Sequence, residues 1–242
     1  MKTKISEWRP DVTGLFFPRR CPVCQDTVED RGEQICGICR TRLPYIRTPF
    51  CLKCGKPLDM EEQEFCRDCS RKRHWFERGR APFVYDQVMR ESIAGYKYNG
   101  RREYAAFYAE EILRRCAKDM RGWQGEALIP IPIHPSRKRK RGFNQAELLA
   151  EELSGRCGIP VDAGLLMRIK KTHVQKDLSD QERLTNLKDA FSVRKGRVPY
   201  QNLILVDDIY TTGSTIDAAA KVLKECGAKN VFFVCICVGR GN

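Results

Sequence analysis

The pattern of apolar and polar positions from about residue 81 onward alternates between two periods. Short apolar runs predict strands, and stretches whose apolar residues recur every three or four positions predict amphipathic helices. The predicted strands cover residues 83–85, 127–133, 164–167, 203–206 and 231–238, and the predicted helices cover 88–98, 102–120, 145–156 and 215–226. Such alternation is typical of parallel sheets with right-handed crossovers. The sequence therefore predicts an α/β fold with a central, mostly parallel sheet.

Eight of the 13 cysteines lie ahead of this region and form four Cys-x-x-Cys pairs that begin fifteen residues apart. The pairs are Cys21/Cys24, Cys36/Cys39, Cys51/Cys54 and Cys66/Cys69. One pair offers two thiolates to a metal ion, and a second pair completes a tetrahedral site of four cysteines. Two zinc ions are therefore predicted. Both are expected to be structural, because closed four-cysteine sites usually stabilise a fold and do no chemistry.

Two alternatives to zinc are weaker. Redox Cys-x-x-Cys motifs come singly beside a βαβ pattern, and disulfides are rare in the cytoplasm. A module of about fifty residues also has too small a core to fold without metal or disulfide support. Consecutive pairing of the motifs gives the simplest arrangement, two ribbons in series, but the spacing also permits crossed pairing.

Four segments follow from these patterns. Residues 1–20 form a lead-in, 21–69 a double zinc ribbon, 70–80 a basic connector and 81–242 the α/β domain. The longest apolar run, residues 231–238, is far shorter than the roughly 20 residues of a membrane span. The first 20 residues also lack the apolar core of a signal peptide. We therefore expect a cytoplasmic protein without membrane insertion.

Composition and charge exclude a disordered chain and leave several kinds of binding partner open. Hydrophobic residues make up 42% of the chain and aromatic residues 9%, which is enough to build a core and argues against global disorder. Lys and Arg number 44 against 31 Asp and Glu, a formal net charge of +13. This excess is compatible with nucleic acid or another phosphate-bearing partner, and also with solubility alone.

The candidate chemistry concentrates in residues 203–215. A buried strand is followed by Asp207 and Asp208, and then by a loop with glycine and hydroxyl residues that opens a helix. In open α/β sheets, ligands bind just beyond the carboxyl ends of the strands. The loop suits a phosphate monoester, because it offers backbone N–H groups and hydroxyls at a helix N-terminus. The two carboxylates suit sugar hydroxyls, or a Mg²⁺ that holds them.

This segment resembles the phosphoribosyl pyrophosphate (PRPP) motif of type I phosphoribosyltransferases. In that motif, four apolar residues precede two acidic residues and a Thr-Thr-Gly-x-Thr loop. The resemblance implies the type I phosphoribosyltransferase fold, with Asp207 and Asp208 on the ribose hydroxyls of PRPP. It also implies that the 5′-phosphate lies among Thr211, Thr212, Gly213, Ser214 and Thr215.

A second candidate segment follows the strand predicted at 127–133. Residues 137–141 are five consecutive cations, placed where a loop should reach the same sheet edge as the PRPP motif. In phosphoribosyltransferases the loop after this strand binds pyrophosphate, which Arg can engage with two oxygens at once. The pyrophosphate residues are therefore expected to be His134, Ser136, Arg137 and Arg141.

The third candidate segment, residues 168–186, is polar and aperiodic. Its position matches a flexible loop that closes over the reacting ribose in the phosphoribosyltransferase superfamily and excludes water. His173 lies in this loop, and we expect it to be a catalytic proton-transfer group.

The whole arrangement resembles the ComF/GntX family. The resemblance rests on the four cysteine pairs, the PRPP motif and a set of short segments: Phe17-Pro18, Tyr96-Lys97-Tyr98 with Gly100, Pro132-x-His134-Pro135, Arg141 to Gln145, Thr172-x-x-Gln175 and Arg183-x-x-Asn186. It implies a double zinc ribbon fused to a phosphoribosyltransferase domain. It also implies a role with the competence machinery, which handles imported single-stranded DNA in bacteria.

Three functions are compatible with these observations. The first is a transferase that displaces Mg²⁺-bound pyrophosphate from C1 of PRPP. The second is a non-catalytic PRPP sensor, and the third is a zinc-ribbon protein that binds single-stranded DNA through its positive charge. Only four residues follow Val238, so an acceptor-recognition element should come from residues 81–100 or from the zinc module, or be absent. Neither the acceptor nor the oligomeric state can be predicted.

Overall fold

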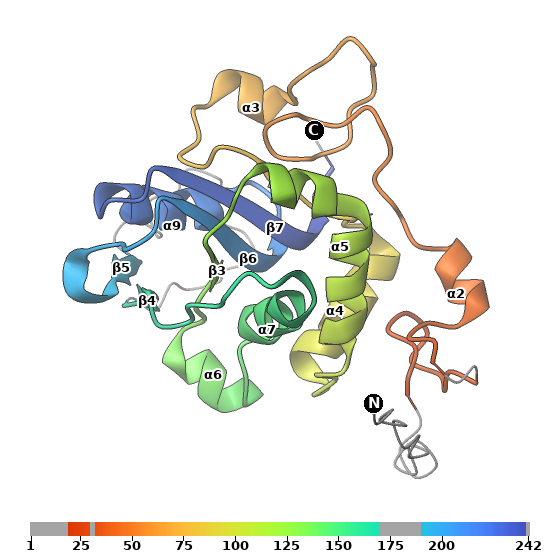
Figure 1. Cartoon of the computed structure of the whole chain (residues 1–242). Helices are drawn as coiled ribbons and strands as arrows, with labels where there is room; N and C mark the ends of the chain where they lie inside the picture. Colours follow the sequence, from red (N-terminus) through yellow and green to blue (C-terminus); the bar gives the residue numbers. More distant parts are fainter. Residues whose placement is uncertain (1–18, 30–31, 170–189, 241–242) are drawn as a thin grey trace, which may run out of the picture.

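The computed structural model describes residues 19–29, 32–169 and 190–240 (Figure 1). Its central sheet has the order β1-β7-β6-β3, and β2 pairs with the same strand as β1. The strands are β1 (Gly79–Arg80), β2 (Phe83–Val84), β3 (Ala127–Pro130), β6 (Asn202–Tyr210) and β7 (Asn230–Val238). Every pairing in this sheet is parallel, which confirms the predicted α/β fold class.

Helices cover both faces of the sheet, because its central strands are apolar on both sides. On one face, Ile204 and Val206 of β6 share a core with the helices α4 (Gln87–Tyr98), α5 (Tyr104–Gly122) and α7 (Gln145–Cys157). On the other face, Leu203 and Leu205 share a core with α9 (Ser214–Glu225). Figure 1 shows the resulting three layers.

The double zinc ribbon spans the sheet edge formed by β1 and β2. Its first half carries α2 (Gly37–Thr41) and contributes Ile35 and Leu43 to the core on the α5 side. Its second half carries α3 (Arg67–Arg71) and packs on the α9 side, where Cys51 and its partners join that core. The ribbon is therefore an integral part of the molecule.

Two predicted strands and one predicted loop differ from the structure. The strand predicted at 127–133 ends at Pro130, and the basic segment after it is a short helix, α6 (Pro135–Arg141), where a loop was expected. The strand predicted at 203–206 runs on to Tyr210, because Asp207 and Ile209 keep their pairing with β7. The predicted basic connector includes β1, which adds a strand to the sheet edge.

The strand predicted at 164–167 is found as β4 (Leu166–Arg168), but it lies outside the central sheet. It pairs antiparallel with β5 (Phe191–Val193), which leads into the short 3-10 helix η1 (Arg194–Gly196). Leu166 and Phe191 pack in the core on the α9 side. Among the described residues, no helix is both long and apolar enough to cross a membrane.

Candidate phosphate and zinc sites

The two adjacent carboxylates lie near the carboxyl end of β6, on opposite faces of the sheet. Successive side chains of a strand alternate in direction. Asp208 lies on the same face of β6 as Ile204 and Val206, which is the face covered by α4 and α7. Asp207 lies on the face of Leu203 and Leu205, which share a core with α9. The pair therefore presents one acid to each layer of helices.

Asp208 is held by cationic and amide groups from two helices. Its Oδ2 accepts from Nζ of Lys97 on α4 (2.9 Å) and from Nε2 of Gln145 on α7 (2.6 Å). Burial disfavours the charge on Lys97, but the carboxylates of Asp208 and Asp207 outweigh this effect and raise the pKa of Lys97. Asp208 is only 6% exposed, so this cation compensates a buried negative charge.

Asp207 has a different environment. Burial and the neighbouring Asp208 carboxylate raise the pKa of Asp207 to about 7, despite a hydrogen bond from the backbone N–H of Asp208 (2.9 Å). Near neutral pH this side chain is therefore present in both protonation states. A bound cation or an additional hydrogen-bond donor would favour its carboxylate.

The loop after β6 turns tightly into α9. Gly213 has φ +80°, and a Cβ at this position would lie 2.6 Å from the Tyr210 hydroxyl oxygen, so glycine is required on both counts. The hydroxyls of Thr212 and Ser214 lie 3.0 Å apart. Thr211 and Thr212 precede the helix, and Ser214 and Thr215 form its first turn. The loop thus combines hydroxyls with the N-terminus of a twelve-residue helix.

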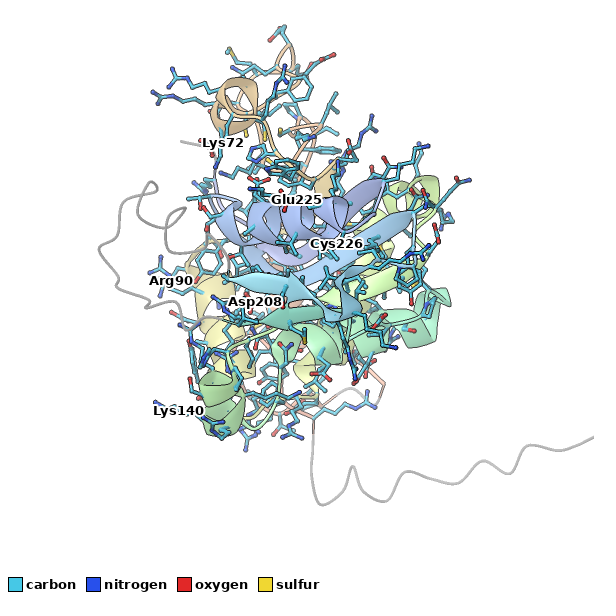
Figure 2. All side chains as sticks on the ribbon, turned by 90° about the vertical axis from the view of Figure 1, so that its left-hand side faces the viewer. Lys72, Arg90, Lys140, Asp208, Glu225 and Cys226 are labelled. Carbon is cyan, nitrogen blue, oxygen red and sulfur yellow. The ribbon has the colours of Figure 1, made fainter. Side chains whose placement is uncertain are left out.

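The predicted pyrophosphate residues lie at and on α6. His134 caps this helix through Nδ1, which accepts from the backbone N–H of Ser136 (3.2 Å), and Gly142 ends it in the left-handed conformation. Arg141 donates to Gln145, the residue that also contacts Asp208. This chain of contacts brings α6 to the edge of the carboxylate site. Figure 2 shows Lys140 on α6 at the outer surface, on the side of the molecule that carries Asp208.

A further cation, Arg168, comes from β4. Burial lowers the pKa of Arg168, nearby Arg137 of α6 lowers it further, and Asp207 opposes both effects. Arg168 therefore has a second guanidinium group and a carboxylate in its surroundings. Such an arrangement fits an anion with several charges, which would relieve the repulsion between the two cations.

The sequence patterns did not assign three of these groups to the site. Lys97 and Gln145 stood within the segments that carry the family resemblance, and Arg168 began the third candidate segment, but none had a role. Their contribution depends on packing between separate elements. His173, with the rest of residues 170–189, lies outside the described part of the chain.

The eight ribbon cysteines form two clusters from consecutive pairs. The first comprises Cys21, Cys24, Cys36 and Cys39, and the second Cys51, Cys54, Cys66 and Cys69. Within each cluster all Sγ atoms lie within 4.8 Å of one another. Sulfur separations of 3.9 Å (Cys24 to Cys36) and 3.6 Å (Cys54 to Cys66) bracket the roughly 3.8 Å expected around tetrahedral zinc with 2.3 Å bonds. The donor sets therefore fit two structural zinc ions.

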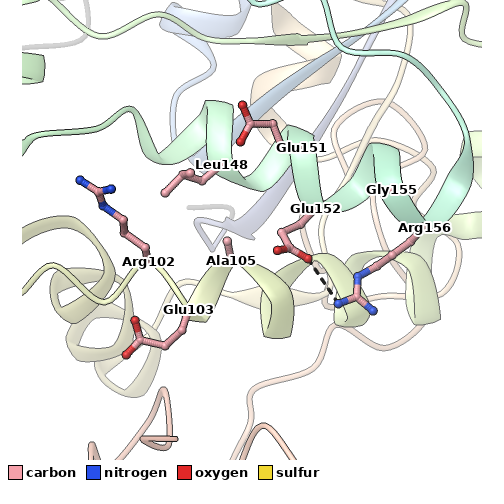
Figure 3. A pocket seen from close by; sticks show the side chains of 8 residues that line it. All are labelled: Arg102, Glu103, Ala105, Leu148, Glu151, Glu152, Gly155 and Arg156. Carbon is pink, nitrogen blue, oxygen red and sulfur yellow. Dashed lines mark hydrogen bonds and ion pairs between the residues drawn. The ribbon is translucent and has the colours of Figure 1, made fainter. Parts of the chain in front are cut away.

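A cavity of about 610 Å³ lies between α5 and α7 and is separate from these sites (Figure 3). It is lined by Arg102, Glu103, Ala105, Leu148, Glu151, Glu152, Gly155 and Arg156. Its lining mixes charges of both signs, and Arg156 pairs with Glu152 (3.4 Å). Because none of the predicted site residues lines it, the carboxylate and phosphate chemistry does not extend into this cavity.

Two known domain families match parts of the chain. Residues 12–70 match the double zinc ribbon domain, and residues 139–242 match the phosphoribosyl transferase domain. The first match includes all eight clustered cysteines. The second includes both aspartates, the loop at α9 and the last three residues of α6, and it begins after His134, Ser136 and Arg137.

Full-length relatives extend the similarity. The chain is 30% identical over 226 residues to competence protein F of Haemophilus influenzae, covering 89% of this chain and 95% of the relative. It is 33% identical over 221 residues to competence protein ComFC of Streptococcus pneumoniae, covering 87% and 84%. It is also 30% identical over 228 residues to DNA utilization protein YhgH of Salmonella typhimurium, covering 92% and 98%.

Proposed function

The chain belongs to the ComF family, which includes competence proteins F and ComFC, and on this basis we propose that it binds PRPP together with Mg²⁺. One observation carries the proposal. The Asp207–Asp208 pair lies directly before a glycine-turned hydroxyl loop at the start of α9, and Arg168 interacts electrostatically with both Asp207 and Arg137 of α6. This one site therefore contains groups suited to bind a phosphate, a ribose and a pyrophosphate.

Each part of the ligand has a proposed partner. The loop of residues 211–215 receives the 5′-phosphate through backbone N–H groups and hydroxyls. The two carboxylates receive the ribose hydroxyls, and Lys97 keeps Asp208 in place. His134, Ser136, Arg137 and Arg141, at and on α6, receive the pyrophosphate together with Arg168. Mg²⁺ fits beside Asp207, since it prefers carboxylate and phosphate oxygens, and it would neutralise charge on the pyrophosphate.

In the proposed reaction, the bond between C1 of the ribose and the pyrophosphate oxygen breaks, and pyrophosphate leaves with the electron pair. An acceptor nucleophile forms the new bond to C1. The chain's own groups hold the two charged ends of PRPP and limit the access of water to the developing cation at C1. His173 remains our candidate for proton transfer. In the alternative, a PRPP sensor, the same groups bind PRPP without breaking this bond.

PRPP affinity tests the site assignment. We expect the Asp207→Asn/Asp208→Asn variant to lose at least tenfold in affinity, about 1.4 kcal/mol, because both hydroxyl-accepting carboxylates are gone. The measurement is calorimetric titration of PRPP with and without Mg²⁺. Glu151→Gln/Glu152→Gln is the matched control, because it removes two adjacent carboxylates that line the separate cavity.

The outcomes separate the possibilities. Equal affinity of wild type and aspartate variant would refute the assignment, provided that circular dichroism shows both to be folded. Pyrophosphate release from bound PRPP in the presence of an acceptor supports the transferase. Tight PRPP binding with no release under any condition supports the sensor.

A second candidate function is the binding of single-stranded DNA by the basic helix α6. The favouring observation is that Lys138, Arg139 and Lys140 are exposed on the same helix as Arg141. The Arg141 guanidinium lies 5.1 Å from the centre of the Tyr98 ring, and Tyr98 is 74% exposed. Cations that track phosphates and an aromatic ring that stacks on bases are typical of single-strand binding. A role with DNA would agree with the names of two relatives, competence protein ComFC and DNA utilization protein YhgH.

Neutralising the outer cations tests this candidate. We expect Lys138→Gln/Arg139→Gln/Lys140→Gln to bind an unstructured oligonucleotide several-fold more weakly, with a shallower salt dependence, because about 0.7 fewer counterions are released per lost phosphate contact. Fluorescence anisotropy at two salt concentrations measures both quantities. The three substituted residues lie outside the proposed pyrophosphate set, so PRPP binding serves as the control. Unchanged affinity and slope would exclude α6 from the interface.

A further inference from the structure

The segment that follows the second cysteine cluster contacts the first turn of α9. Nδ1 of His74 donates to Oδ2 of Asp217 (2.6 Å), and the backbone N–H of Trp75 donates to Oδ1 of the same residue (2.9 Å). His74 has only 1% of its side chain exposed and Asp217 only 7%. Both oxygens of a buried carboxylate are therefore held by the zinc module's connector, one turn beyond the phosphate loop.

The same segment also contacts the residue before the loop. Phe76 is fully buried and meets the rings of Tyr210 (5.9 Å) and Phe233 (4.9 Å) edge-on. Tyr210 stacks on Phe233 (4.7 Å), and its hydroxyl occupies the space that a side chain at Gly213 would need. The connector thus supports the loop at both ends, through Tyr210 on one side and Asp217 on the other.

The second zinc ribbon holds this connector in place. Cys51, Cys54 and Cys66 are buried in the same core as Phe76 and Tyr210. The backbone N–H of Gly79 donates to the carbonyl of Lys53 (2.7 Å), which ties the connector's last residues to the turn between two ligands. Lys56, next to that turn, lies 5.9 Å from the Tyr210 ring. The ribbon, the connector and the loop therefore form one continuous packed unit.

The first ribbon makes contacts of a different kind. The Tyr104 hydroxyl donates to the carbonyl of Cys21 (3.2 Å), and Gln34 donates to Glu110 (2.7 Å). Both partners lie on α5, on the opposite face of the sheet from α9. Two chemically similar zinc sites thus support different layers of the molecule.

We propose that the second zinc ribbon positions the phosphate loop of residues 211–215 through two residues, His74 and Phe76. His74 fixes the first turn of α9 through Asp217, and Phe76 fixes Tyr210. The loop is then already in its binding conformation before the phosphate arrives, so little affinity is lost to ordering it. The effect on PRPP affinity rests on the function proposed above, whereas the effect on the loop's conformation does not.

Two contacts between the connector and the same helix allow a matched comparison. His74 meets α9 at its first turn, and Glu77 meets Lys224 (2.5 Å) near its last turn. We expect His74→Ala to weaken PRPP binding roughly tenfold, because a buried carboxylate loses a hydrogen bond. Glu77→Gln should stay within about twofold, because its ion pair is partly exposed. His74→Asn should recover much of the loss, since its amide can donate from nearly the same position.

Hydrogen exchange at the amides of residues 211–217 provides a readout that needs no ligand. We expect roughly tenfold faster exchange there in His74→Ala, with wild-type rates in Glu77→Gln and in the β3–β6 core. Equal exchange in wild type and His74→Ala would overturn the proposal, whether or not PRPP binds. If wild type protects the loop through His74 but binds no PRPP, the proposed function fails and the positioning role stands.

Discussion

Removing zinc should destabilise the whole chain and not only its N-terminal module. Apparent binding free energies of structural zinc sites are about 10–16 kcal/mol at neutral pH. The ribbon residues Ile35 and Leu43 share a core with α5, and Cys51 shares one with α9, so loss of the ribbons exposes both faces of the sheet. We expect the free energy of unfolding to fall by at least about 3 kcal/mol, which lowers Tm by about 6–12 °C for a chain of this size.

Zinc content and melting should be measured together. Wild type should release two zinc ions per chain to a chelator, and Tm should fall with the zinc content. Cys226→Ser is the control, because Cys226 ends α9 and belongs to neither cluster, so that this variant should keep both zinc ions. A purified, folded chain that contains no zinc and melts at the wild-type temperature would contradict the structural role.

Replacing Lys97 with methionine should destabilise the fold by about 3–5 kcal/mol, the usual effect of removing one partner from a buried ion pair. The side chains of Lys97 and Asp208 are 17% and 9% exposed, and they meet at 2.9 Å. Without the ammonium group, Asp208 keeps a buried charge, and among the described residues the Gln145 amide remains as its side-chain donor. The expected result is a lower urea midpoint at an unchanged slope.

Two further variants separate the charge from the packing of Lys97. Lys97→Arg keeps the cation and should lose much less stability than Lys97→Met. The double variant Lys97→Met/Asp208→Asn should recover much of the loss, because both charges are then absent and Gln145 still has an acceptor. Destabilisation of the double variant equal to the sum of the two single variants would show that Lys97 and Asp208 do not interact.

Local patterns in the sequence were enough to predict the main elements. The helices and strands from residue 203 onward are found within a few residues of their predicted ends, apart from the extension of β6. Their apolar spacing reflects the two faces of a buried sheet, which is local information. The α6 helix was missed because its residues are almost all charged and carry no apolar period. Its ends are set by Pro135 and Gly142.

Contacts between distant elements had no such signature. His74 and Asp217 are 143 positions apart, and Gln145 and Asp208 are 63 positions apart. A lone histidine or glutamine in a sequence does not indicate its partner. The antiparallel pairing of β4 with β5 could not be predicted either, because a three-residue strand has too few positions to show which sheet it joins.

The sequence by itself determined the α/β class, the eight zinc ligands, and the position of two aspartates directly before a loop suited to phosphate. Each of these depends on a fixed spacing of residues along the chain. Tertiary structure alone decided which cysteine pairs share a site. It also decided which side chains compensate Asp208, and that the second ribbon supports the loop at α9. Those features arise where separate elements pack together, and packing brings together residues that no local pattern connects.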